Sequence, residues 1–130
     1  MFDFSRIKTI AVIGLSNNPD RPAYFVSQYM KEKGFRIIPI NPKGEEVLGE
    51  KGYQRLRDIP ADVKIDVANF FMRAEKLLPI VEEALERGIK IIWLQQGIVS
   101  QEAAKLAREK GAEIIMDRCI KVEHMDALSR

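Results

Sequence analysis

The stretch MKEKGFRIIPI, residues 30 to 40, leads from an amphipathic segment through a basic residue and a glycine into a short apolar run. The same order recurs in ALERGIKIIWL, residues 84 to 94, and in AREKGAEIIM, residues 107 to 116. Glycine is favoured where a helix ends in the left-handed conformation, and a basic residue is favourable near the negative end of the helix dipole. The pattern therefore predicts a helix, a cap and a strand three times over, with the caps at Gly34, Gly88 and Gly111.

Five short apolar runs are predicted to be strands. They lack strict alternation, and near-continuous apolarity is typical of strands that are buried on both faces of a parallel sheet. The runs cover residues 7–13, 35–40, 65–71, 89–94 and 112–116.

Amphipathic segments lie between these runs. Residues 22–33 and 74–87 carry apolar side chains at helical spacing, and Ser100 is a suitable N-cap for a third helix. Residues 41–63 contain three glycines and two prolines, so a loop with a short helix near residues 54–58 is expected there. The alternation predicts an α/β fold: a Rossmann-like, doubly wound, mostly parallel five-stranded sheet of order 3-2-1-4-5 with helices on both faces.

Composition narrows the class of protein. The chain has 130 residues, 46% hydrophobic and 31% charged, which predicts a single soluble domain over residues 1–130. A net charge of +2 gives no general attraction to nucleic acid or to a membrane surface, so any anion site must be local. No apolar run reaches the roughly 20 residues of a membrane span, and the single cysteine, Cys119, suits a reducing compartment. A cytoplasmic location is expected.

The loops after the strands are the expected ligand site, because ligands of doubly wound sheets bind at the carboxyl ends of the strands. After the first strand, Gly14 permits a tight turn, and Ser16 with the N–H groups of the following helix is suited to a phosphate. Asn17, Asn18 and Arg21 add donors. The alternative is an ordinary loop in which the polar side chains satisfy local turn geometry.

The usual dinucleotide fingerprint is missing. Gly14 stands alone where G-x-G-x-x-G would be required, and Lys43 follows the second strand where an NAD site has an acidic residue. A cation there suits a ligand with an additional phosphate near its ribose, although a solvent-exposed surface lysine is the alternative. Arg73, after the third strand, is suited to bidentate phosphate binding or is simply a helix-entry residue in solvent.

No set of neighbouring groups suited to acid-base or nucleophilic catalysis is recognisable, and no metal-ligand spacing occurs. No catalytic residue and no metal site are therefore predicted. His124 is expected to pack or to be exposed near the C-terminus, and Asp117 is expected to be a surface or capping group. Gln95 and Gln96 offer neutral donors after the fourth strand, or cap the adjacent backbone.

With these loops placed, the chain resembles the small stand-alone coenzyme A-binding domain family, related to the nucleotide-binding domain of succinyl-CoA synthetase alpha subunits. The resemblance rests on IAVIGLSNNPDRPAYFV, KGFRIIPINPKGEEVLGEKGY, WLQQG and MDRC, which extend from about residue 7 to residue 120. The combination of NPK after the second strand with WLQ after the fourth is the most specific part.

The resemblance implies that the chain binds coenzyme A (CoA) or a CoA thioester. The residues that it assigns to the phosphates are Gly14, Ser16, Asn17 and Arg21. It places Lys43 near the 3'-phosphoadenosine, with Asn41 and Pro42 shaping the loop. The residues assigned to the adenine or its phosphates are Phe71, Met72 and Arg73. Those assigned to the path of the pantetheine arm are Leu94, Gln96 and Gly97.

A non-catalytic binding module is the expected function. The alternative is an enzyme or enzyme subunit that uses NAD(P) or acyl-CoA and is completed by another chain. A homo-oligomer and a partner enzyme subunit both stay open, as do the acyl group and the physiological role. Cys119, just past the fifth strand, is either an inert buried thiol or a group able to form a mixed disulfide with the CoA thiol.

Overall fold

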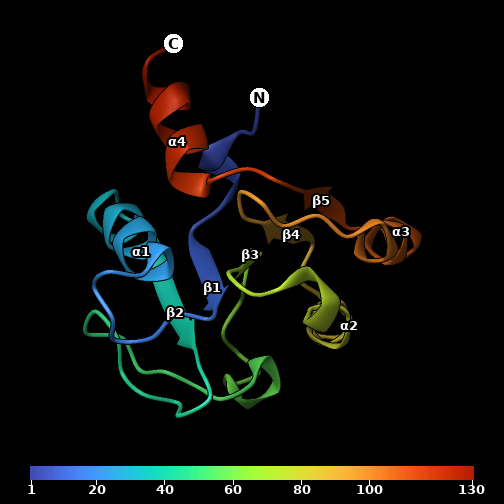
Figure 1. Ribbon diagram of the computed structural model, residues 1–130, viewed down its shortest axis with the longest axis horizontal. Coiled ribbons are helices and arrows are strands. Elements are labelled where there is room, and N and C mark those ends of the chain that lie inside the picture. Colours follow the sequence, from blue (N-terminus) through green and yellow to red (C-terminus); the bar gives the residue numbers. More distant parts are fainter.

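A computed structural model describes residues 1–130, which form one five-stranded sheet and four α-helices (Figure 1). The strands are β1 (Thr9–Ile13), β2 (Arg36–Ile40), β3 (Val67–Phe70), β4 (Ile91–Leu94) and β5 (Glu113–Ile115). The helices are α1 (Pro22–Glu32), α2 (Leu78–Glu86), α3 (Gln101–Glu109) and α4 (Ile120–Leu128). Three short 3-10 helices are η1 (Phe4–Arg6), η2 (Leu56–Asp58) and η3 (Ala74–Lys76).

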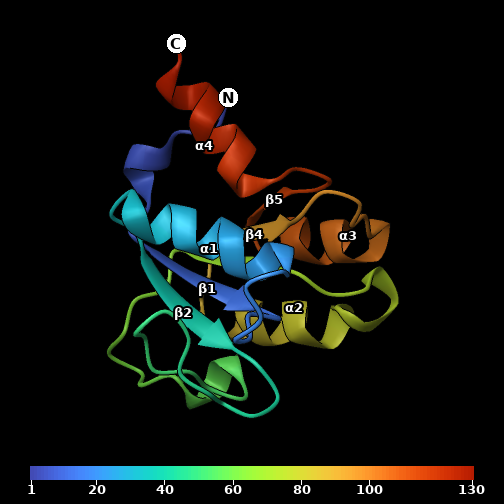
Figure 2. The ribbon, with the colours of Figure 1, turned by 60° about the vertical axis from the view of Figure 1, so that its left-hand side comes forward.

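Helices cover both faces of the sheet, which confirms the predicted doubly wound α/β fold. In Figures 1 and 2, α1 and α4 lie on one side of the strands and α2 and α3 on the other. Alternate residues of β1 enter two separate hydrophobic clusters: Ile10 and Val12 pack with α1 residues, whereas Ala11 and Ile13 pack with residues of η2, α2 and α3. The sheet is parallel at every pairing.

The predicted strand order was wrong. The order is β2-β1-β3-β4-β5, so β3 pairs with β1 and not beyond β2, and the order reverses between β1 and β3. The cause lies in the second half of the connection between β2 and β3, where Leu56, Ile59 and Ile65 pack in the cluster of α2, on the face opposite α1. Crossover connections between parallel strands are right-handed, so a connection on that face brings the chain from β2 back past β1. The order 3-2-1-4-5 would need the connection from β1 to β2 and the connection from β2 to β3 to lie on the same face.

The element boundaries largely follow the sequence pattern. Gly34, Gly88 and Gly111 all have positive φ, at +99°, +86° and +75°, as helix caps in the left-handed region require. Ser100 caps α3, since its Oγ accepts a hydrogen bond from the Ala103 N–H at 3.1 Å. The helix expected over residues 74–87 is instead η3 followed by α2, which begins at Leu78 with Pro79 in its first turn.

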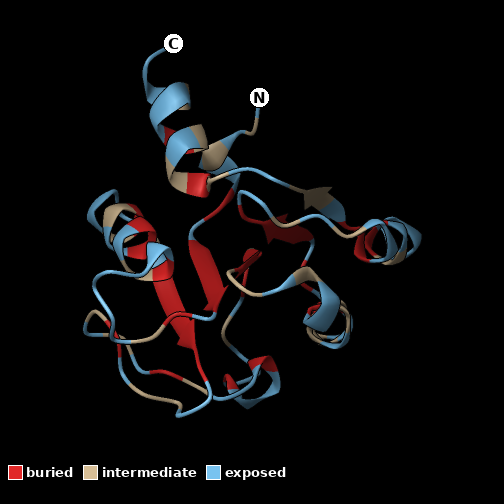
Figure 3. Cartoon of the chain, in the orientation of Figure 1, coloured by how far each residue is buried: buried red, intermediate tan, exposed pale blue.

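Burial follows the order of the strands. β1, β3 and β4 are buried along their whole length, whereas the edge strand β5 has one exposed and two half-buried residues (Figure 3). The prediction that the strands are buried on both faces is therefore confirmed for the three central strands. No helix combines the length and the apolarity that crossing a bilayer would require.

Candidate functional site

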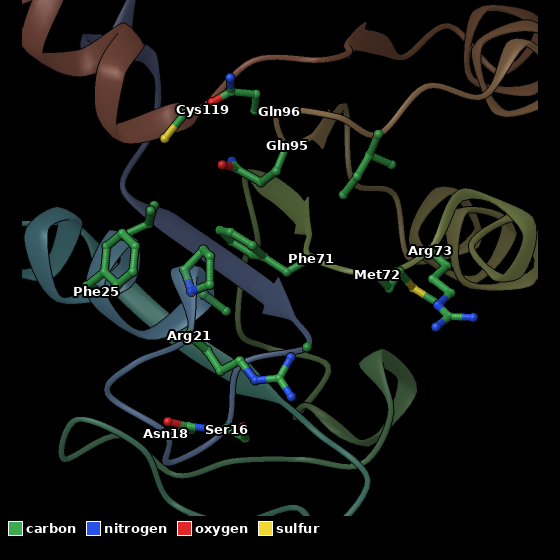
Figure 4. Close-up of a pocket in the computed structure, with 15 residues that line it drawn as sticks. Ser16, Asn18, Arg21, Phe25, Phe71, Met72, Arg73, Gln95, Gln96 and Cys119 are labelled. Atoms are coloured by element: carbon green, nitrogen blue, oxygen red, sulfur yellow. The ribbon is translucent and has the colours of Figure 1, made fainter.

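An open cleft of about 760 Å³ lies at the carboxyl ends of β1, β3 and β4. It is at the position where the strand order reverses, which is the expected ligand site of a doubly wound sheet. Figure 4 shows Ser16, Asn18 and Arg21 toward one end and Gln95, Gln96 and Cys119 toward the other, with the Phe25 and Phe71 rings between them. Of the predicted site residues, those that line this cleft are Gly14, Ser16, Arg21, Phe71, Met72, Arg73 and Gln96.

Gly14 closes the floor between the first and third strands. Its φ is +96°, and a Cβ at this position would lie 2.3 Å from the Phe71 carbonyl oxygen. The Gly14 N–H donates to the Ile40 carbonyl at 2.9 Å, and the Phe71 N–H donates to the Ile13 carbonyl at 2.9 Å. A side chain at this turn would separate the two strand ends, so the tight turn predicted from the sequence is a steric requirement.

The charged residues that line the cleft are all cationic, although the chain as a whole is nearly neutral. Arg21 is the N-cap residue of α1, with Pro22 in the first turn, and Arg73 precedes η3. Both arginines are exposed, neither takes part in a salt bridge, and no carboxylate lines the cleft. The positive end of α1 adds to the same potential.

A second cavity of about 410 Å³ adjoins the cleft, because Gly14 and Met72 line both. Its walls are mainly apolar and come from β1, the end of β2, η2 and α2. Two further predicted residues, Asn41 and Pro42, line this second cavity. Glu83 also borders it; its partial burial opposes ionisation, but the Arg57 N–H and the Arg55 guanidinium outweigh this effect and hold the pKa of the carboxyl below its usual value.

Asn41 fastens the loops after β1 and β2 to each other. Its side chain is 3% exposed, and its Nδ2 donates to the carbonyls of Leu15 and Glu45 at 3.0 and 3.2 Å. Its Oδ1 accepts from the Glu45 N–H at 2.9 Å. The predicted loop-shaping role of Asn41 agrees with this geometry, in which every polar atom of the side chain is used inside the protein.

Four predicted site residues lie outside both cavities. The Asn17 amide donates to the Glu46 carbonyl at 2.6 Å, so it joins two loops. Leu94 is buried in the core. The Gly97 N–H donates to Asp117 Oδ1 at 2.7 Å, so Asp117, expected to be a surface or capping group, binds the turn after β4. Lys43 is exposed in the turn beside Pro42, at the edge of the second cavity.

The cleft also contains residues that were not assigned to the site. Asn18, in the first loop, was expected only as an additional donor, whereas Phe25 of α1 and Ile98 after β4 carry no signal in the sequence. Gln95 is buried at 4% exposure and donates from Nε2 to Asn69 Oδ1 of β3 at 2.7 Å. Asn69, the polar residue inside the apolar run of β3, was the available signal for this pair.

His124 lies away from the cleft and packs as expected. It is 7% exposed, its Nδ1 lies 2.8 Å from the Tyr29 hydroxyl, and its ring meets those of Phe4 and Phe35 edge-on. Burial lowers the pKa of His124, and the charge of Lys33 lowers it further. No cluster of His, Cys, Asp and Glu side chains suited to a metal ion occurs in the structure.

The family model described as CoA binding domain matches residues 8–125 of the chain. The Bacillus subtilis (strain 168) protein YneT is 47% identical over 119 residues, covering 92% of this chain and 87% of YneT. A solved structure of a hypothetical protein from Pyrococcus horikoshii OT3 superposes with a TM-score of 0.90 at 40% identity, over 95% of this chain and 86% of the other.

A more distant relative is a subunit of a larger enzyme. The alpha subunit of ADP-forming acetate–CoA ligase II from Pyrococcus furiosus is 29% identical over 135 residues, which cover 95% of this chain and only 29% of that subunit. The chain therefore corresponds to one part of the ligase subunit. Because the family model matches the chain along most of its length, this chain belongs to the CoA-binding domain family.

Proposed function

We propose that this protein binds coenzyme A, or a CoA thioester, across the cleft and the adjoining cavity, and that it acts as a binding module without a catalytic site of its own. The observation that carries the proposal is the pair of arginines without carboxylate partners, Arg21 and Arg73, in a cleft with no acidic lining residue. A pyrophosphate beside Arg21, Ser16 and the first turn of α1 would be held by charge-assisted hydrogen bonds.

The adjoining cavity is the proposed place of the adenosine. Its apolar walls suit a purine ring, and Pro42 at its edge brings Lys43 within the same turn. A 3'-phosphate on the ribose would meet the Lys43 ammonium group at this edge. NAD lacks that phosphate, and the site carries a cation where NAD recognition requires an acid.

The names of the relatives support the ligand class and leave the role open. The family is described by CoA binding, and the ligase subunits that contain a similar stretch act, by their names, on acetate and CoA. Because this chain matches only 29% of such a subunit, a role beside a partner enzyme chain is the second candidate.

The test is calorimetry of the purified protein with CoA and with 3'-dephospho-CoA. CoA should bind more tightly, and Lys43→Ala should narrow the difference between the two ligands. Arg21→Gln should weaken both ligands by about 1.5 to 3 kcal/mol, which is about ten- to hundredfold in Kd.

Two exposed residues of α3, remote from the cleft, serve as matched controls: Lys105→Ala and Arg108→Gln should leave both affinities unchanged. Equal affinity of the unaltered protein for CoA and dephospho-CoA would remove the role of Lys43. NAD(P) in place of CoA in the native mass spectrum of the protein as purified would overturn the ligand assignment.

A further inference from the structure

Cationic side chains gather where the strands begin, at the edge of the sheet opposite the cleft. This amino edge comprises the first residue of each strand and the three residues before it. It contains two acidic residues and seven cationic ones, and all seven cations are exposed: Arg6, Lys8, Lys33, Arg36, Lys64, Lys90 and Lys110. The amino edge therefore carries an excess of five positive charges, whereas the whole chain has a net charge of only +2.

Both acidic residues of the amino edge are already engaged within the protein. Asp66 accepts hydrogen bonds from two backbone N–H groups at the start of β1, at 2.9 and 3.0 Å, and lies 3.9 Å from Lys64 Nζ. Glu113 forms a salt bridge with Arg6 at 3.0 Å. The cations of the amino edge that take part in no salt bridge are Lys8, Lys33, Arg36, Lys90 and Lys110. Their charge is available to a partner.

Helix ends explain only part of this concentration of charge. Lys33 and Lys110 are the C-cap residues of α1 and α3, where a cation compensates the helix dipole. Lys8, Arg36 and Lys90 begin or directly precede strands and cap no helix. The parallel register aligns the starts of all five strands, about 4.8 Å from one strand to the next. Neighbouring strand starts thus lie within about one Debye length, so the potentials of their cations add.

The amino edge also has a hollow of about 430 Å³ that can receive an acidic side chain. Its charged lining residues are Arg6, Asp62, Lys64, Asp66, Arg87 and Lys90. The Arg87 guanidinium is used inside the protein, because it donates to four carbonyls within residues 56–63. Lys90 has no salt-bridge partner, so its ammonium group is the contact that this hollow offers to a carboxylate.

Other features of the amino edge favour a protein partner over nucleic acid or a membrane. No exposed aromatic ring lies there to stack with bases, and none of the large exposed hydrophobic side chains that could enter a lipid surface belongs to it. The N-termini of the α-helices, which suit phosphate groups, follow the carboxyl ends of the strands at the opposite edge. In Figure 2 the arrowheads of β1 and β2 mark that opposite edge.

We propose that the amino edge is a docking surface for an acidic face of a partner protein. The cleft lies at the other end of the strands, so a partner bound here leaves the cleft open to its ligand. A role beside a partner chain, the second candidate function above, would use this surface. The inference does not depend on which ligand the cleft binds.

The test uses decaglutamate as an acidic polypeptide probe, titrated into the whole isotope-labelled protein at low ionic strength and followed by NMR of the backbone amides. The signals of Lys8, Arg36 and Lys90 should shift most, and those of Arg21 and Arg73 in the cleft should shift little. Added salt should weaken the binding steeply, because the charges are exposed. Absence of binding, or shifts centred on the cleft, would overturn the proposal.

Charge reversal distinguishes a docking surface from general attraction. Arg36→Glu combined with Lys90→Glu should weaken decaglutamate binding about tenfold or more. The matched control, Lys51→Glu combined with Lys105→Glu, makes the same change in net charge at exposed positions outside the amino edge and should weaken binding less than about threefold. Equal losses in the two pairs would overturn the proposal. Should the reversed edge variant fail to fold, the same two pairs of positions changed to Gln give the comparison, with the larger loss again expected at the amino edge.

Two further arms identify the class of partner and separate this inference from the proposed function. A short DNA duplex or phosphatidylserine vesicles that bind the amino edge under conditions where decaglutamate does not would assign the surface to nucleic acid or to a membrane, and so overturn the proposal. The variant with Arg36→Glu and Lys90→Glu should bind CoA in calorimetry as the unaltered protein does. Absence of CoA binding in the unaltered protein would overturn the proposed function alone.

Discussion

At the scale of single residues, the Phe71 carbonyl occupies the place that a Cβ of Gly14 would take. This contact gives the steric reason for the tight turn that was expected at Gly14. Asn17 was expected to bind phosphate, yet its amide joins the loop to Glu46. Contacts of this kind depend on which loop lies beside which, and a linear pattern contains no such information.

Gly14→Ala should destabilise the protein by about 2 to 4 kcal/mol, because it combines a positive φ with an impossible contact to the Phe71 carbonyl. Gly34→Ala is the matched control. Its φ of +99° is nearly the same as that of Gly14, but nothing lies within 4 Å of the added Cβ, so only the conformational cost of about 1 to 2 kcal/mol applies. Urea denaturation measures the free energy of unfolding of both variants. Equal losses would show that the contact with the Phe71 carbonyl adds no cost.

Asn41→Ala should cost about 2 kcal/mol or more, since it removes the hydrogen bonds that join the loops after β1 and β2 and leaves buried backbone groups unpaired. Asn17→Ala is the control at the same junction, because Asn17 is exposed and its side chain donates a single hydrogen bond. Its loss should stay below about 1 kcal/mol. Chemical denaturation of the two variants should therefore give clearly different midpoints, and similar midpoints would contradict the fastening role of Asn41.

At the scale of elements, the repeated order of helix, glycine and strand was enough to place three strands, three helices and their caps. What failed was the position of β3, because residues 41–66 carry no long amphipathic helix whose apolar face could be read. Leu56 and Ile59 indicate which face of the sheet the connection covers, but only when their packing against α2 is known. Helix α4 was also not predicted, and it is held through the buried Ile120 and His124 and not through a regular apolar stripe.

The docking of α4 should make stability depend on pH. The folded-state pKa of His124 lies below its unfolded value of about 6.5, so the unfolded chain binds more protons as the pH falls. The contribution of the neutral, buried His124 to the free energy of unfolding is complete above about pH 7. It is lost as the pH falls through 6.5 toward the folded-state pKa. His124 is the only histidine, so the free energy of unfolding between pH 7.5 and pH 5.5 should report on it.

The variant His124→Gln keeps a hydrogen-bond acceptor for the Tyr29 hydroxyl but removes the titration. It should lower stability at pH 7.5 and flatten the dependence on pH. In Tyr29→Phe, where the imidazole stays buried, the dependence should persist. A slope in His124→Gln as steep as in the unaltered protein would assign the effect to other groups.

At the scale of the whole molecule, the candidate site was predictable because the topology brings the carboxyl ends of all parallel strands to one edge. Residues just after the end of a strand, such as Phe71 after β3 and Gln96 after β4, line the cleft as that rule requires. Leu94 and Gly97, two residues before and one after Gln96, do not: Leu94 is still inside the sheet, and Gly97 is occupied by Asp117. The last position of the strand and the hydrogen bonds of the turn after it therefore decide which neighbours reach the cleft.

The proposed ligand should stabilise the whole fold, because the cleft is built from the ends of β1, β3 and β4 together with α1 and exists only in the folded chain. At a free CoA concentration of one hundred times its Kd, the free energy of unfolding should rise by about 2.7 kcal/mol, and each further tenfold should add about 1.4 kcal/mol. Urea denaturation across a range of CoA concentrations gives this dependence, from which Kd can be calculated and compared with calorimetry. Dephospho-CoA at equal concentrations should stabilise less, and Lys43→Ala should narrow the difference in stabilisation between the two ligands. A calorimetric Kd without the corresponding stabilisation would mean that the heat arises from association outside the folded cleft.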